Sequence, residues 1–196
     1  MVRKYTLGRR GEAAEETRRR IVEATFALHA EQGVAATTMT QIAERAGVSV
    51  GTVYHHFATY DDAIQACGEH ASALAPPPGP ELFAGAATRA ERIERLAHAS
   101  FERYERIPNY EAVRAERKNY APLREFFAAE AQLIRELAAS AIGRGRDGRG
   151  AAVVAALIDP GVWRALRDAG LSTAAAASQA AGVINAWLDT RGARPD

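Results

Sequence analysis

The fold of this chain is decided by residues 37–57, TTMTQIAERAGVSVGTVYHHF. Thr38 is a favourable helix N-cap, and Gln41 three residues later completes the pattern of a capping box. Gly47 ends this first helix after about two turns, and Ser49 caps a second short helix. Two short helices around a glycine turn are typical of a helix-turn-helix unit, although the spacing alone also fits an ordinary helical hairpin.

The second of these helices carries the side chains expected of a DNA-reading element. An α-helix fits the major groove of B-DNA, and the residues of its first turn face the base edges. Gly51 allows the backbone to approach closely, and Thr52 can contact a thymine methyl group or a phosphate. Tyr54, His55 and His56 offer hydrogen-bond donors to phosphate oxygens. The sequence therefore predicts a DNA-binding helix.

Together with TRRRIV at residues 17–22, the same stretch closely resembles the N-terminal domain of the tetracycline-repressor (TetR) family. The resemblance covers roughly residues 17–70 and keeps the spacing of the pieces IA, AGVS, GTVY and HF. It implies a homodimeric, all-helical transcription regulator, usually a repressor. Such a protein leaves its DNA when a small molecule enters a variable C-terminal helical domain.

Two departures from the family pattern affect the predicted site. His29 stands where the family usually has Phe, and we expect it to be a packed histidine. The family places Ser-Lys-Glu at the start of the next helix, and its lysine touches phosphate; the run here is Thr59-Tyr60-Asp61-Asp62. Tyr60 could still donate to a phosphate, but the two acids would repel DNA, so the affinity should depend on other cations.

The overall composition bounds the class of protein. The chain has 196 residues, 47% of them hydrophobic, and 25 basic against 24 acidic side chains give a net charge of +1. These values suit one or two soluble domains and exclude DNA binding by bulk charge. Cys67 is the single cysteine, so neither a disulfide framework nor a Cys-cluster zinc site is expected. We predict no metal, no cofactor and no membrane segment, and a cytoplasmic location.

The first 20 residues form the basic patch that the total charge conceals. They contain seven basic and three acidic side chains, and Gly8 and Gly11 separate the basic pairs. Residues 1–11 are therefore predicted to be a flexible arm that reaches the minor groove or flanking phosphates, with a solvated terminus as the alternative. With the domain at 12–70, the predicted DNA contacts are Arg3, Lys4, Arg9, Arg10, Thr38, Thr40, Gln41, Ser49, Val50, Gly51, Thr52, Tyr54, His55, His56 and Tyr60.

The rest of the chain is predicted to be a second helical domain. The proline-rich run at 75–80 marks a linker, and spacings of three and four recur over residues 81–196, whereas strand-like alternation is missing. The predicted fold is all-α: a three-helix DNA-binding domain followed by a helical ligand-binding and dimerisation domain.

Glu130 is the most informative residue of this second domain. It lies in the middle of the apolar stripe of its helix, so it should point inward, and a buried carboxylate must be paired or protonated. It could contact a ligand, or it could form an internal pair with Arg114 or Arg117. The predicted ligand-binding residues are Ser100, Tyr104, Arg117, Phe126, Phe127, Glu130 and Trp163.

The last predicted helix, from Ser172 to about Asp189, is apolar over most of its circumference. Such a helix suggests pairing with a second subunit, and a helix buried within its own chain is the alternative. The predicted interface residues are Ala176, Ala180, Val183, Ile184 and Trp187. A dimer also fits a palindromic operator, because two recognition helices must lie about one DNA turn apart.

The sequence thus favours a dimeric, ligand-responsive transcription regulator that binds a palindromic operator, a repressor by resemblance. An all-helical enzyme is a rival, but no His-Glu-x-x-His, nucleophile elbow or glycine-rich nucleotide loop is present, so we predict no enzyme. A nonspecific architectural DNA-binding protein is a second rival, and it would be expected to carry a strongly basic total charge.

Overall fold

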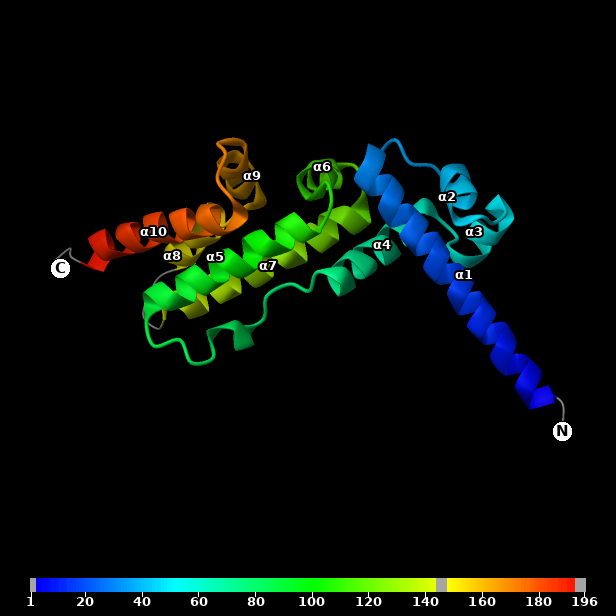
Figure 1. The fold of residues 1–196 in the computed structure, drawn as a ribbon, viewed down its shortest axis with the longest axis horizontal. Helices are drawn as coiled ribbons and strands as arrows, with labels where there is room; N and C mark the ends of the chain where they lie inside the picture. The colour runs from blue at the N-terminus through cyan, green and yellow to red at the C-terminus, as the bar shows by residue number, and fades with distance from the viewer. Residues whose placement is uncertain (1–2, 144–147, 193–196) are drawn as a thin grey trace. The chain divides into compact units, whose positions relative to one another are not determined.

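The computed structural model describes residues 3–143 and 148–192, and within these ranges the regular elements are all helices (Figure 1). The all-α prediction is therefore confirmed. In chain order they are α1 (Arg3–Gln32), α2 (Met39–Ala46), α3 (Val50–His56), α4 (Tyr60–Leu74), η1 (Pro80–Phe83), α5 (Arg89–Arg106), α6 (Tyr110–Ala115), η2 (Glu116–Lys118), α7 (Ala121–Ile142), α8 (Gly148–Leu157), α9 (Pro160–Asp168) and α10 (Thr173–Gly192).

The chain divides into two compact units. The N-terminal unit consists of Met1–Leu74 and Ala112–Glu125, and the C-terminal unit consists of Ala75–Glu111 and Phe126–Asp196. Residues 112–125 follow the proline-rich linker in sequence, yet they pack with the helices that precede it. Helices α6 and α7 therefore each contribute residues to both units.

The N-terminal unit is built around α1, which packs against α2 and α4, while α2 packs against α3. Ile21 and Leu28 of α1 share a core with Ile42 of α2, Val53 of α3 and Phe57. These side chains are all at most 5% exposed. Their burial fixes the orientation of the two short helices, which are too short to be stable alone.

The N-terminal arm is helical, in contrast to the flexible segment that we predicted. Helix α1 begins at Arg3, and its first turns extend beyond the helices that pack against it (Figure 1). Gly8 and Gly11 each cost a helix about 1 kcal/mol, but the neighbouring Arg, Glu and Ala residues are strong helix formers. The side chains of Arg3, Lys4, Arg9 and Arg10 lie outside the part of the chain whose side chains are described.

The C-terminal unit is organised by the packing of α10 against α5, and α8 and α9 also contact α10. Its core includes Ile93, Leu96 and Phe101 of α5 and Ile184 and Leu188 of α10. The helix starts follow the sequence signals. Thr88 forms a capping box with Glu91 at the start of α5, and the Asp159 side chain accepts from the Gly161 N–H at the start of α9.

None of the helices in the described ranges combines the length and the apolar character that a bilayer crossing requires.

Candidate functional site

Helix α2 is bounded by the caps that the sequence predicts. The Thr38 hydroxyl accepts from the Gln41 N–H at 3.3 Å, and Gln41 Oε1 accepts from the Thr38 N–H at 2.9 Å. Gly47 follows the helix with a left-handed backbone (φ 66°), which glycine adopts without steric cost. The capping box thus places the turn that leads into α3.

Helix α3 exposes the residues that we predicted to contact DNA. The Ser49 hydroxyl caps the helix by accepting from the Thr52 N–H at 3.1 Å. Val53 is fully buried, whereas Gly51 and His55 are exposed and Tyr54 is 51% exposed. Val50, Thr52 and His56 are half-buried, and Ser49 is exposed. One side of α3 therefore anchors the helix, and its first turn and opposite side face outward.

Of the three residues at the start of α2 that we predicted to contact DNA, two form the capping box of this helix and one does not. Thr40 is exposed on the first turn of α2. Thr38 and Gln41 use their side-chain oxygens in the capping box, and Gln41 Oε1 also lies 3.4 Å from Gln32 Nε2. Thr38 and Gln41 therefore primarily position α2. Thr38 and Thr40 are both exposed, and the Thr40 hydroxyl takes no part in the capping box.

Tyr60 uses its hydroxyl inside the N-terminal unit. The hydroxyl donates to the Val34 carbonyl oxygen at 2.7 Å and lies 2.9 Å from His29 Nε2. Because these two contacts occupy the hydroxyl, they argue against the phosphate contact that we predicted for Tyr60. Tyr60 is therefore not part of the proposed DNA interface. Burial raises the pKa of the Tyr60 hydroxyl, which keeps it protonated and able to donate.

His29 is a packed histidine, as expected, and its tautomer follows from its partners. It is 3% exposed, and burial lowers its pKa to about 4, so the ring is neutral near pH 7. Because Tyr60 donates to Val34, its oxygen must accept from His29 Nε2–H. His29 Nδ1 is then the acceptor for the Cys67 thiol at 3.4 Å. Burial raises the pKa of that thiol to about 12, which keeps it protonated.

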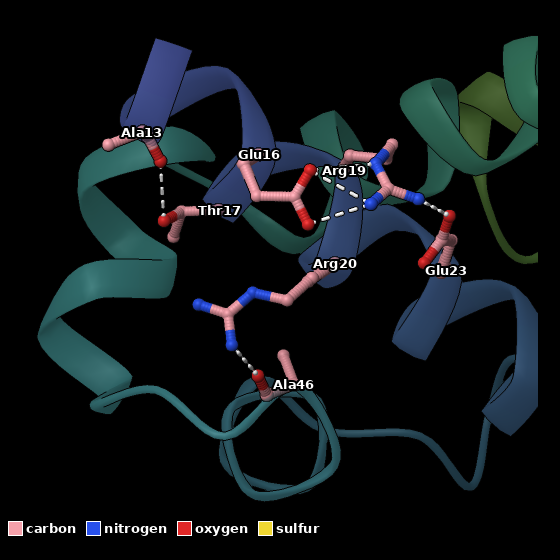
Figure 2. Close-up of polar contacts among 7 residues, drawn as sticks. All are labelled: Ala13, Glu16, Thr17, Arg19, Arg20, Glu23 and Ala46. Atoms are coloured by element: carbon pink, nitrogen blue, oxygen red, sulfur yellow. Dashed lines mark hydrogen bonds and ion pairs between the residues drawn. The ribbon is translucent and has the colours of Figure 1, made fainter. Parts of the chain in front are cut away.

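Two arginines in the middle of α1 are held by partners of the same unit (Figure 2). Arg19 pairs with Glu16 and Glu23, both at 2.7 Å. Arg20 Nη1 donates at 3.2 Å to the carbonyl oxygen of Ala46, at the end of α2. A cation at a helix C-terminus complements the helix dipole. Sequence reasoning missed this role of Arg20, because the spacing along α1 does not indicate which helix lies opposite.

The helix-turn-helix region matches a known family model, described as bacterial regulatory proteins of the tetR family, over residues 21–67. The matched residues span the C-terminal part of α1, all of α2 and α3, and half of α4. Residues 21–67 of this chain are thus similar to the tetR family.

Curated relatives share this region at high identity. The transcriptional regulator SrpR of Pseudomonas putida is 47% identical over 53 residues, which are 27% of this chain and 25% of SrpR. The transcriptional repressor KstR of Mycolicibacterium smegmatis is 48% identical over 46 residues, 24% of this chain and 22% of KstR. The matches thus span about a quarter of the length of these relatives.

The fold of the whole chain also has relatives among solved structures. FadR of Bacillus subtilis, solved in complex with stearoyl-CoA, has a TM-score of 0.65 and covers 84% of this chain and 96% of its own. The two sequences are 17% identical, so this likeness concerns the fold. The helical architecture of this chain, including its C-terminal unit, is thus shared with that structure.

Glu130 of α7 is paired internally, but not with the residues that we predicted. Arg103 Nε of α5 donates to Glu130 Oε1 at 2.7 Å, and the Tyr110 hydroxyl donates to Glu130 Oε2. The side chains of Arg103 and Glu130 are 3% and 11% exposed. Arg114 and Arg117 belong to the N-terminal unit, where Arg117 Nη1 donates to the Arg114 carbonyl oxygen. Arg117 is therefore not a member of the Glu130 cluster.

A chain of aromatic rings adjoins this ion pair through Tyr110. Tyr104 lies 5.0 Å from Tyr110 and 6.1 Å from Trp163 between ring centroids. Phe127 lies 5.5 Å from Tyr110 and 5.1 Å from Phe126. With Ser100, Arg103 and Glu130, these rings form what we call the Arg103 cluster. Of the predicted ligand residues, the C-terminal unit contains Ser100, Tyr104, Phe126, Phe127, Glu130 and Trp163.

Arg103 and Tyr110 are the members of the cluster that sequence reasoning missed. Arg103 falls one turn after Ser100 on α5, a spacing that places both on one face of a helix. Arginine is rarely buried, which is why its position on the apolar face was not weighted. The buried carboxylate at Glu130 was the available signal, because it required a cation that could reach it.

The predicted dimer residues of α10 fall into two groups. Ala176, Ala180 and Ile184 are at most 6% exposed, on the helix that packs against α5. These three residues fill the core of their own unit, so their assignment to a subunit interface was wrong. Val183 is 48% exposed, and Trp187 is half-buried. The wide apolar surface of α10 is explained in part by its contacts with α5, α8 and α9 of its own unit.

Proposed function

We propose that this protein is a dimeric, ligand-responsive transcription regulator, a repressor, that reads a palindromic operator with α3. The observation that carries the proposal is the exposed first turn of α3, held by the Ser49 cap and the buried Val53. The curated relatives support it, because SrpR and KstR are named as a transcriptional regulator and a transcriptional repressor. We accordingly assign no catalytic step to this chain, and such a regulator acts in the cytoplasm.

Gly51 is the centre of the proposed interface. A Cβ atom added there would meet only Ser49 Oγ within 4 Å, at 3.8 Å, which is ordinary van der Waals contact. Packing within the unit therefore does not require a glycine at this position. Close approach to DNA does provide a reason, because a base edge or a phosphate can reach the backbone there. Thr52 lies in the same turn and can contact a thymine methyl group or a phosphate.

Phosphate contacts flank this centre. Tyr54 and His55 are exposed on α3, and His56 is half-buried at its end. Thr40 offers a hydroxyl from α2. The proposed interface further includes the basic start of α1, which extends as a helix and whose Arg3, Lys4, Arg9 and Arg10 supply the cations that Asp61 and Asp62 cannot. Such contacts set register and affinity without reading sequence.

The second subunit is proposed to dock on the outward side of α10. Ala175, Gln179, Gly182, Val183 and Ala186 are exposed along this side. A Cβ atom added at Gly182 would meet nothing within 4 Å, so the surface there is open. Small side chains allow two helices to approach closely, and Val183 and Trp187 supply apolar area. A pair of subunits then presents two α3 helices to the two half-sites.

The effector is proposed to bind at the Arg103 cluster of the C-terminal unit. The segment from Tyr110 to Glu130 connects this cluster to the DNA-binding unit along the chain. Its ends bond to each other through Tyr110 and Glu130, and its middle bonds to the α1–α2 loop through Glu116. A ligand that prefers one arrangement of this segment shifts the population of DNA-competent dimers by its differential affinity.

A salt-titrated binding experiment tests the proposal. Fluorescence anisotropy compares a palindrome taken from beside the gene of this protein with random DNA of the same length. We expect the palindrome to bind at least about 10³-fold more tightly, with two chains per site. Equal affinity for both DNAs would favour an architectural binder, and no affinity for either would remove DNA from the account.

A further inference from the structure

We propose that the effector is a neutral, largely apolar molecule whose carbonyl-type oxygen accepts hydrogen bonds from Arg103 Nη1 and Ser100 Oγ. The inference rests on the proposed function in one respect, since it takes the C-terminal unit to be the effector-binding part of the chain. It adds the chemical class of the ligand and assigns two donors.

Two unsatisfied donors carry the inference. Within the described residues, Ser100 Oγ and Arg103 Nη1 are both buried without a hydrogen-bond partner. Ser100 is fully buried and Arg103 is 3% exposed. A serine in a helix can bond to the carbonyl four residues earlier, but Ser100 does not. Buried polar groups without partners are rare in proteins, so a pair of them on one face of α5 calls for an acceptor.

The Glu130 carboxylate, which is the acceptor within the cluster, already accepts hydrogen bonds from other donors. Both oxygens of Glu130 accept hydrogen bonds, one from Arg103 Nε and one from the Tyr110 hydroxyl. Burial and the adjacent Glu130 raise the pKa of Tyr110, so this hydroxyl stays protonated and keeps donating. Arg103 Nη1 bonds to neither oxygen of Glu130, so an acceptor for this nitrogen must come from outside this bonded set.

Charge balance selects the class of acceptor. Arg103 and Glu130 carry opposite charges and form a buried pair that is neutral as a whole. A ligand anion would give the site a net negative charge in a poorly solvated environment, which is costly. A neutral carbonyl oxygen satisfies the donors without adding charge.

The aromatic rings indicate what the rest of the ligand resembles. Trp163, Tyr104, Tyr110 and Phe127 form a chain in which the centroids of successive rings lie 6.1, 5.0 and 5.5 Å apart. Rings of this kind favour flat or apolar partners over strongly hydrated ones. Together with the two donors, they describe a molecule with one polar oxygen on an apolar body.

Three probes of nearly equal size test this class in the full-length protein. Acetophenone has a neutral acceptor oxygen, benzoate has an anionic one, and ethylbenzene has none. Scanning calorimetry at equal probe concentrations measures the melting temperature. We expect acetophenone to raise it, and we expect about tenfold weaker binding of benzoate and of ethylbenzene. Equal or tighter binding of either control, or no effect of acetophenone, would overturn the proposed class.

A Ser100→Ala variant tests the assigned donor without breaking the ion pair. If the hydroxyl lacks a partner in the free protein, its removal should leave the melting temperature unchanged or raise it by about 2–4 °C. The variant should also lose most of the preference for acetophenone over ethylbenzene. A lowered melting temperature with an intact preference would mean that Ser100 is structural.

Operator binding separates this inference from the proposed function. If the protein binds the palindrome but not acetophenone, the proposed function stands and the proposed ligand class is wrong. If it binds acetophenone through Ser100 but does not bind the palindrome, the ligand class stands and the proposed function is wrong. The calorimetry needs no DNA, so the two results are independent.

Discussion

Glu116 accepts hydrogen bonds from two successive backbone N–H groups of the loop between α1 and α2, that of Val34 at 2.8 Å and that of Ala35 at 2.6 Å. The preceding residue, Gly33, has a left-handed backbone (φ 85°), and a Cβ atom there would lie 2.6 Å from Glu116 Oε1. The absence of a side chain at Gly33 thus allows the carboxylate to reach the loop. These bonds join Glu116, in the segment 112–125, to the helices of the N-terminal unit that precede the linker.

Replacing Glu116 should therefore weaken the DNA-binding unit. We expect Glu116→Ala to lower the free energy of unfolding by about 2–3 kcal/mol, because two charge-assisted bonds disappear. Urea titration followed by circular dichroism measures this change. Glu125→Gln is the matched control, since Glu125 is an exposed glutamate of the same segment. Equal stabilities of the two variants would remove the Glu116 contact from the account.

The buried His29 predicts a loss of stability in acid. Its pKa is about 4 in the folded state, whereas an unperturbed histidine has a pKa of about 6.5. Between these values the unfolded chain binds a proton that the folded chain excludes. The free energy of unfolding should fall by up to about 3 kcal/mol as the pH falls from 6.5 to 4. His29→Phe should reduce this slope, and an unchanged slope would assign it to other groups.

Tyr60→Phe distinguishes a structural from a DNA-contacting hydroxyl. The bond from the Tyr60 hydroxyl to the Val34 carbonyl predicts a loss of about 1–2 kcal/mol in the free energy of unfolding. The salt dependence of operator binding should stay the same. A slope that falls by about one, with stability intact, would instead show that the hydroxyl meets a phosphate.

Val183 is the test residue for the proposed subunit interface. Val183→Glu would bury an unpaired charge between two copies of α10, so the Kd of the dimer should rise by about 30-fold or more. Sedimentation velocity measures the shift to monomer. Ala128→Glu serves as the control, because Ala128 is exposed on α7. A dimer that tolerates glutamate at Val183 would place the interface elsewhere.

Deletion of residues 1–10 tests the helical extension of α1. Removal of the basic side chains should weaken operator binding. For each phosphate that the shortened protein no longer binds, the slope of log affinity against log salt should fall by about one. Random and palindromic DNA should be affected alike. An unchanged slope would mean that the start of α1 does not contact DNA.

Sequence reasoning succeeded where the determinants are local. The caps at Thr38 and Ser49, the Gly47 turn and the outward first turn of α3 all follow from residues a few positions apart. It also predicted that Glu130 would point inward and would need a partner or a proton, because that follows from its place on one helix.

The predictions failed where the answer depends on which elements meet. Glu130 pairs with Arg103. The Tyr60 hydroxyl donates a hydrogen bond to the Val34 carbonyl oxygen. Ile184 of α10 is buried on the helix that packs against α5. Each of these depends on a long-range packing choice that periodicity cannot supply. The N-terminal arm failed for a different reason, since two glycines were given more weight than the helix formers around them.

The central claim, that α3 reads the operator, is tested most directly by the affinity of Gly51→Gln for palindromic and random DNA. A Cβ atom at Gly51 would make only ordinary contact within the unit, and the position is exposed, so the melting temperature should stay close to that of the wild type. Ala73→Gln, at an exposed position near the end of α4, is the matched control. We predict that Gly51→Gln lowers the ratio of palindromic to random affinity by at least about tenfold, while Ala73→Gln leaves it unchanged. A Gly51→Gln protein that keeps the wild-type ratio would contradict the claim.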